Sequence, residues 1–138
     1  MNLFKKLLII LVFFSLGIKS VMAEIYVDID SGNINPISIA IMNFESKDKE
    51  LASIGEKITS VITNDLKRSG LFTPISHDAF VDKTQDIDAM PTFENWAVIN
   101  AMALVYGNIE AKEDGKVRVE FQLWDVLGQI RLEGQVLL

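Results

Sequence analysis

Residues 36–75 read PISIAIMNFESKDKELASIGEKITSVITNDLKRSGLFTPI and decide the fold, because they join a buried strand to an amphipathic helix. Residues Ile37–Ile41 are largely apolar and β-branched, which is typical of a central strand covered on both faces. From about Asp48, apolar side chains recur at helical spacing, at Leu51, Ile54, Ile58, Val61, Ile62 and Leu66. Gly70 favours the left-handed conformation that ends a helix, so we expect the helix to stop at Ser69. The chain then returns to the core at Leu71, Phe72 and Ile75.

The rest of the chain predicts a second helix and further strands. Residues 77–90 have no sustained period and carry four aspartates, so we expect a short turn of helix and a solvated loop. Pro91 suits the first turn of a helix over residues 92–101, in which Phe93 and Trp96 share a face. Three β segments follow, over residues 103–111, 117–123 and 130–136, and they are separated by turn residues.

Residues 24–30 alternate apolar and polar side chains and predict one more strand. The resulting order is β, β, α, α, β, β, β. We therefore predict an α/β (α+β) fold with a mixed sheet of about five strands and two main helices packed on one face. Trp96 and Trp124 continue apolar periodicities, so we expect both to fill the core.

The first 23 residues are typical of an export signal. Lys5 and Lys6 precede an apolar run over residues 7–16, and Val21-Met22-Ala23 offers the small residues of a cleavage site. The run is shorter than the ~20 residues that a membrane helix needs, so we expect cleavage before Glu24 rather than anchoring. The predicted organisation is a signal peptide over residues 1–23, a strand and hinge over 24–33, and a C-terminally truncated domain over 34–138.

The composition restricts the possible functions. The chain has no cysteine, which excludes disulfides and a lipid-modified bacterial N-terminus. Its net charge is −6, and loss of Lys5, Lys6 and Lys19 with the signal leaves 10 basic against 19 acidic side chains. Such a field repels nucleic acid and anionic lipid, so we expect neither as a partner.

No catalytic or metal-binding pattern stands out. His77 is the only histidine, and no nucleophile-elbow motif supports a triad built on it. Asp28-x-Asp30 lacks the spacing of a calcium loop, and Asp86-x-Asp88 lacks the following glycine. We therefore expect no enzymatic activity, no metal and no cofactor.

Signal cleavage would place an amphipathic strand at the mature N-terminus. Its apolar side chains Ile25, Val27 and Ile29 lie on one side, and Ser31-Gly32-Asn33 follows as a hinge. Such a segment can add to the sheet edge of a partner through its main chain. It can equally form an edge strand of its own sheet, and composition does not separate the two interpretations.

Several segments resemble the N-terminal domain of the TolB family, periplasmic components of the Tol-Pal system. The most specific are Asp65-Leu66-Lys67-Arg68-Ser69-Gly70-Leu71-Phe72-Thr73-Pro74-Ile75 and Leu123-Trp124-Asp125. The others are residues 24–32, residues 36–41 with Phe44, Trp96 with residues 99–101, residues 104–107 and residues 119–122. Together they span nearly all of the chain after the signal.

The resemblance implies a non-enzymatic periplasmic adaptor that supports outer-membrane integrity and cell division. In that family the freed N-terminal segment binds the C-terminal domain of the inner-membrane protein TolA, and a C-terminal β-propeller binds the lipoprotein Pal. Carried over, the TolA-binding residues are Glu24, Ile25, Tyr26, Val27, Asp28, Ile29, Asp30, Ser31 and Gly32. This sequence lacks the propeller and stops before the helix that normally finishes the family's N-terminal domain. The alternatives are a secreted hydrolase subunit and a ligand-binding accessory domain, which a concave apolar pocket would indicate.

Overall fold

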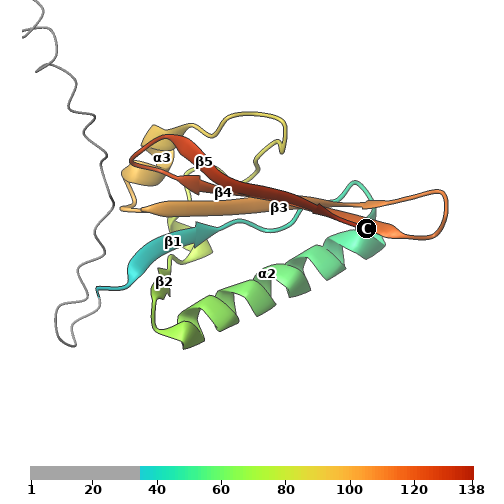
Figure 1. Cartoon of the computed structure of the whole chain (residues 1–138), viewed down its shortest axis with the longest axis horizontal. Coiled ribbons are helices and arrows are strands. Elements are labelled where there is room, and N and C mark those ends of the chain that lie inside the picture. The colour runs from blue at the N-terminus through green and yellow to red at the C-terminus, as the bar shows by residue number, and fades with distance from the viewer. Residues whose placement is uncertain (1–34) are drawn as a thin grey trace, which may run out of the picture. The chain divides into compact units, whose positions relative to one another are not determined.

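A computed structural model describes residues 35–138 (Figure 1). The predicted signal peptide and the predicted strand over residues 24–30 lie outside the described residues. The elements are β1 (Ile37–Ile41), α2 (Lys49–Ser69), β2 (Phe72–Pro74), a short 3₁₀ turn (His77–Ala79), α3 (Phe93–Ala97), β3 (Ala103–Ala111), β4 (Val117–Asp125) and β5 (Ile130–Leu137).

The described strands form one mixed five-stranded sheet in the order β2-β1-β3-β4-β5. Strand β1 runs parallel to both β2 and β3, whereas β3, β4 and β5 form an antiparallel meander. The predicted α+β fold with a mixed sheet of about five strands is confirmed. Strand β2 was not predicted as a strand, because three residues that include Pro74 are too short to show an alternation.

The two helices lie on opposite faces of the sheet, so the prediction that both pack on one face is wrong (Figure 1). Helix α2 covers the face that carries Ile39 and Ile41, together with Val105 of β3. The α3 residues Phe93 and Trp96 pack instead in the cluster that contains Ala40. Helical periodicity shows that a helix has an apolar side, but it does not show which face of the sheet that side meets.

Helix α2 has the termini that the sequence predicts. The Asp48 side chain accepts a hydrogen bond from the Glu50 backbone N–H at 2.8 Å, which caps the first turn. Gly70 has a φ of 74° and its N–H bonds to the Lys67 carbonyl at 3.2 Å, which closes the last turn. Local chemistry therefore explains both ends of this helix.

Helix α3 is shorter than predicted. It spans five residues, Phe93–Ala97, instead of residues 92–101. Asn100 follows in the left-handed region at a φ of 59°, and the Ala101 N–H bonds to the Trp96 carbonyl at 3.1 Å. Asparagine tolerates this conformation better than most residues, so Asn100 turns the chain into β3.

Both tryptophans belong to the core, as predicted. The exposed fraction is 0% for Trp96 and 7% for Trp124, and both pack in the cluster on the α3 face. The rings of Phe93 and Trp124 meet edge to face with centroids 5.6 Å apart. Strand β4 is therefore packed on the face that Trp124 occupies.

Candidate interaction surfaces

The residues predicted to bind TolA, residues 24–32, precede the described part of the chain. Their role stays a prediction. The described sheet takes all five of its strands from residues 37–137.

A loop segment before α3, residues 84–90, is tied to the sheet by side chains of β3 and β4. We name it the acidic strap, because it carries Asp86 and Asp88. Gln122 Nε2 donates to the Ile87 carbonyl at 2.8 Å, and the Tyr106 hydroxyl lies 3.1 Å from the Ala89 carbonyl. These bonds hold the strap over the sheet on the α3 side.

The polar groups beneath the strap form one network. Gln122 Oε1 accepts from Trp124 Nε1 at 3.1 Å and lies 3.1 Å from the Tyr106 hydroxyl. Burial raises the pKa of Tyr106, because the charged phenolate would lose its hydration there. Burial therefore favours the neutral tyrosine, whose single hydroxyl proton has two acceptors in reach, the Ala89 carbonyl and Gln122 Oε1.

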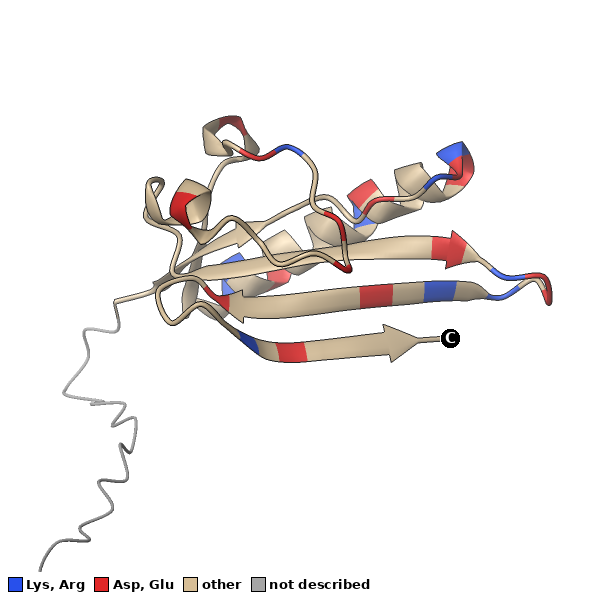
Figure 2. Cartoon of the chain, turned by 90° about the horizontal axis from the view of Figure 1, so that it is seen from above, with Lys and Arg blue, Asp and Glu red and all other residues tan. Residues whose placement is uncertain are grey.

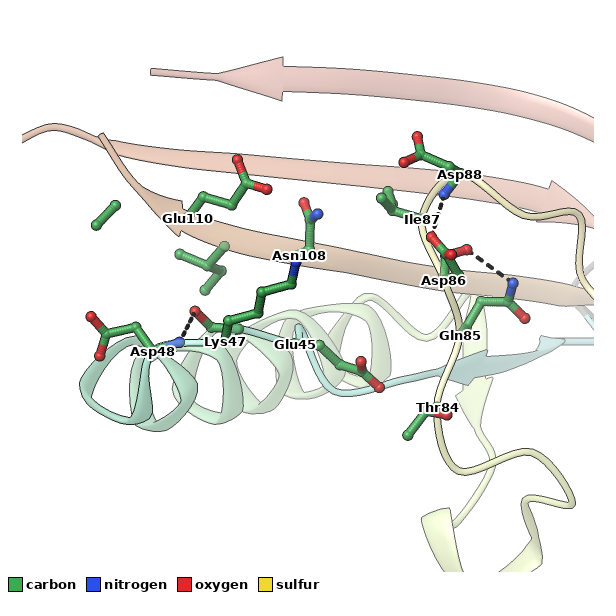
Figure 3. Close-up of a pocket in the computed structure, with 13 residues that line it drawn as sticks. Glu45, Lys47, Asp48, Thr84, Gln85, Asp86, Ile87, Asp88, Asn108 and Glu110 are labelled. Atoms are coloured by element: carbon green, nitrogen blue, oxygen red, sulfur yellow. Dashed lines mark hydrogen bonds between the residues drawn. The ribbon is translucent and has the colours of Figure 1, made fainter. Parts of the chain in front are cut away.

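Beside the strap lies an open groove with a volume of about 800 Å³, which we name the acidic groove (Figure 3). Its walls are the strap, residues 45–48 before α2, and the end of β3. It contains one lysine, Lys47, and five carboxylates, those of Glu45, Asp48, Asp86, Asp88 and Glu110. Figure 2 shows acidic residues along the loop before α3 and at the end of β3.

The carboxylates of the groove have different partners. Asp48 caps α2, and Asp86 Oδ1 accepts the Asp88 backbone N–H at 3.0 Å. Glu110 lies 3.0 Å from Lys112 Nζ and 3.8 Å from an Arg118 nitrogen. The hydrogen bond and the charge of Lys112 hold the pKa of Glu110 below its usual value. Of the five, Glu110 is the one with a cation in salt-bridge range within residues 35–138.

Asn108 of β3 also lines the groove (Figure 3). Its side-chain oxygen is buried and accepts no hydrogen bond from the described residues. The backbone here is well paired, because the Ile109 N–H donates to the Glu45 carbonyl at 2.8 Å. At this position it is therefore the Asn108 side chain, and not the neighbouring backbone, that lacks a partner within residues 35–138.

The described residues bring no catalytic group together. His77 is exposed and its ring packs on Phe80 at a centroid distance of 4.9 Å. None of the hydrogen bonds found within residues 35–138 involves its imidazole. The same residues contain no cluster of three or more His, Cys, Asp or Glu side chains that could hold a metal ion. The acidic groove is lined mainly by polar and charged residues, so it is not the concave apolar pocket that a ligand-binding accessory domain predicts.

Strand β5 forms an edge of the described sheet, and all eight of its residues are exposed. Two β5 residues, Arg131 and Glu133, are charged. The pairing of β5 with β4 is irregular next to them, where the register shifts between Leu123 and Trp124 of β4. Charges and irregular pairing weaken an edge as a template for further strands. This edge is therefore partly protected.

Sequence reasoning missed two polar residues of these surfaces, Asn108 and Gln122. Each occupies a strand position on the α3 face, where a polar residue is ordinary if that face meets water. Only the burial of Gln122 under the strap, and of the side-chain oxygen of Asn108, distinguishes them. No sequence pattern could have identified them.

Within residues 35–138, no helix has the length and apolar character needed to cross a membrane.

Comparisons with known proteins agree with the fold. The family described as the TolB amino-terminal domain matches residues 25–132. The structure of TolB from Acinetobacter baumannii is similar with a TM-score of 0.59 and 25% sequence identity, over 75% of this chain and 23% of that chain. This chain thus spans about a quarter of that protein.

Two further solved structures share the fold. The LpoB C-terminal domain from Escherichia coli matches with a TM-score of 0.51 and 16% identity, over 76% of this chain and 83% of that chain. The lipoprotein GNA1162 from Neisseria meningitidis matches with a TM-score of 0.52 and 15% identity, over 74% of this chain and 78% of that chain. At these identities the likeness concerns the fold alone. The family match covers most of the chain, from residue 25 to residue 132 near the start of β5, and the chain therefore belongs to the TolB amino-terminal domain family.

Proposed function

We propose that this protein is a non-enzymatic periplasmic adaptor of the Tol-Pal system that binds the C-terminal domain of TolA through residues 24–32. The observation that carries the proposal is the family match, which begins at residue 25 and so includes nearly all of this segment. The described sheet is compatible with it, because its five strands all come from residues 37–137. In the proposed complex the segment adds to a sheet edge of TolA and leaves its own domain intact.

The wider role follows from the same proposal. The adaptor links inner-membrane TolA to the outer membrane, where it supports envelope integrity and division. Contact with Pal is assigned to the β-propeller of the family. Residues 24–138, tested by themselves, should then bind TolA but not Pal.

Deletion of residues 24–32 tests the TolA contact. Calorimetric titration with the TolA C-terminal domain should show binding to residues 24–138 and none to the deleted protein. The thermal midpoint should stay nearly unchanged, because the described core lies outside the deletion. Binding that survives the deletion, or a midpoint that collapses with it, would contradict the proposal.

Single prolines test the mode of binding. In a strand, alternate backbone N–H groups face the same neighbour, and proline removes one of them. Substitutions at Ile25, Val27 and Ile29 should therefore affect affinity differently from those at Tyr26 and Asp28. Each lost bond contributes ~0.5–1.5 kcal/mol and the ring adds a steric penalty, so the sensitive set should lose roughly tenfold or more. Equal losses at all five positions would argue against strand addition.

Intact-mass measurement tests whether the protein is exported to the periplasm and its signal removed. Protein recovered from the periplasm should begin at Glu24, because Val21-Met22-Ala23 forms the predicted cleavage site. A retained Met1 would contradict export and, with it, the proposed meeting with TolA.

A further inference from the structure

We propose that the acidic strap, residues 84–90, is a lid that opens as one unit while the sheet and both helices stay folded. Its opening uncovers the polar network of Tyr106, Gln122 and Trp124 to solvent. This lid belongs to the described residues alone, and the inference does not depend on the proposed TolA contact.

The strap has little apolar anchorage in the core. Among its seven residues Ile87 is the one that is buried, with 9% of its surface exposed. Ala89 and Met90 beside it are exposed. Segments with few buried apolar contacts open more readily than the core around them. The contacts of Ile87 are therefore the main apolar interaction that opening gives up.

The hydrogen bonds found between the strap and the sheet run through side chains and not through paired backbones. Gln122 Nε2 donates to the Ile87 carbonyl at 2.8 Å, and the Tyr106 hydroxyl lies 3.1 Å from the Ala89 carbonyl. The backbone bond found in the strap is internal, from the Ala89 N–H to the Asp86 carbonyl at 3.1 Å. The strap can therefore lift without breaking a strand pairing of the sheet.

The side chains beneath the strap are polar, which lowers the free energy needed to open it. Gln122 is 8% exposed, and its Oε1 accepts from Trp124 Nε1 at 3.1 Å. When the strap lifts, water can take the place of the Ile87 carbonyl as the acceptor for Gln122 Nε2. The closed lid thus keeps the bond between Gln122 and Trp124 away from solvent, and the open lid exposes it.

Hydrogen exchange of the Trp124 indole N–H, followed by NMR at increasing low concentrations of urea, tests the lid in the parent protein. Lid opening exposes little surface, so this rate should stay nearly constant as urea rises. The slowest backbone amides of the central strand β3 exchange by global unfolding, so their rates should rise steeply. Without urea, opening at Trp124 should be at least about tenfold more frequent than global unfolding. A Trp124 rate that rises as steeply as the β3 rates would overturn the proposal.

Two matched truncations separate the lid from the rest of the fold. Ile87 and Leu51 are aliphatic and equally buried, at 9% and 8% exposed, but Leu51 packs in the cluster on the α2 face. Ile87→Ala should speed Trp124 exchange about tenfold or more, because the open state already lacks the contacts that this variant removes. Leu51→Ala should speed β3 exchange by a similar factor and leave Trp124 exchange unchanged, because the α2 core stays packed whether the lid is open or closed.

Equal acceleration of Trp124 exchange in the two variants would show that the indole is exposed only by global unfolding, and it would overturn the proposal. No acceleration in Ile87→Ala would overturn the role of Ile87 as the anchor of the lid. If either variant fails to fold, the urea series on the parent protein still decides whether the lid opens separately.

Discussion

Gly55 of α2 lies directly against the backbone of Phe44, so closely that a methyl group at position 55 would overlap the Phe44 carbonyl oxygen. Four residues later, Thr59 Oγ1 accepts the Phe44 N–H at 3.1 Å. Helix α2 is thus held against the segment that follows β1. Gly55 and Thr59, one turn apart, set the distance between the helix and the sheet. Phe44 in turn packs in the cluster on the α2 face.

Gly55→Ala should lower the free energy of unfolding by about 1–3 kcal/mol, because overpacking against backbone forces the helix away from the sheet. Helix propensity alone predicts the opposite sign, a gain of up to about 1 kcal/mol. Lys57→Ala, at an exposed position of the same helix, should stay within about 0.5 kcal/mol of the parent protein. Urea denaturation of the three proteins decides the sign, and a stabilised Gly55→Ala would contradict the close approach.

Thr59→Val should lower the free energy of unfolding by roughly 1–3 kcal/mol, since it leaves the buried N–H of Phe44 without an acceptor. Thr63→Val is the comparison, because the Thr63 hydroxyl only donates to the Thr59 carbonyl within α2, at 2.7 Å. Its loss should be smaller. Chemical denaturation measures both, and equal losses would mean that the bond to Phe44 adds nothing specific.

Trp124→Ala should cost about 3–5 kcal/mol of stability, as truncations of large buried aromatic residues do. The variant removes the ring that packs on Phe93 and the donor to Gln122 Oε1. Leu127→Ala, at a side chain that is 69% exposed three residues later, should change the denaturant midpoint little. A loss below about 1 kcal/mol in Trp124→Ala would place the ring at the surface instead.

Tyr106 should make stability fall at high pH. Its pKa is raised in the folded protein, so the folded state holds the phenolic proton more tightly than the unfolded state. The stability that this tighter proton binding contributes is fully present below about pH 10, the ordinary pKa of tyrosine. It is lost as the pH rises through the pKa of Tyr106 in the folded state. Tyr106→Phe lacks this titration, so the difference in unfolding free energy between parent and variant should shrink above pH 10.

Melts from pH 8 to 11 measure that difference, and the comparison cancels the titration of Tyr26 and of the lysines. At neutral pH the variant should be less stable by about 1 kcal/mol, since it loses the one hydrogen bond that the hydroxyl proton makes, to the Ala89 carbonyl or to Gln122 Oε1. A gap that stays constant over the whole range would mean that Tyr106 ionises alike in both states.

Features that depend on neighbouring residues followed from the sequence. The bounds of α2 did, because Asp48 and Gly70 act on backbone groups within one turn of themselves. Strand β4 did as well, since the strict alternation of Val117, Val119, Phe121 and Leu123 is a local pattern that matches the pleat of a strand. The burial of Trp124 could also be predicted, from its phase along β4.

Features that depend on contacts between distant segments were decided only by the tertiary structure. Strand β2 exists because residues Phe72–Pro74 pair with β1, more than thirty positions earlier. Helix α3 lies on the face opposite α2, and the acidic groove joins residues near 45, 86 and 108. A local sequence pattern indicates how a side chain fits its own helix or strand. The pattern does not indicate which distant backbone pairs with that element, or which face of the sheet the element covers. Both depend on packing summed over the whole domain.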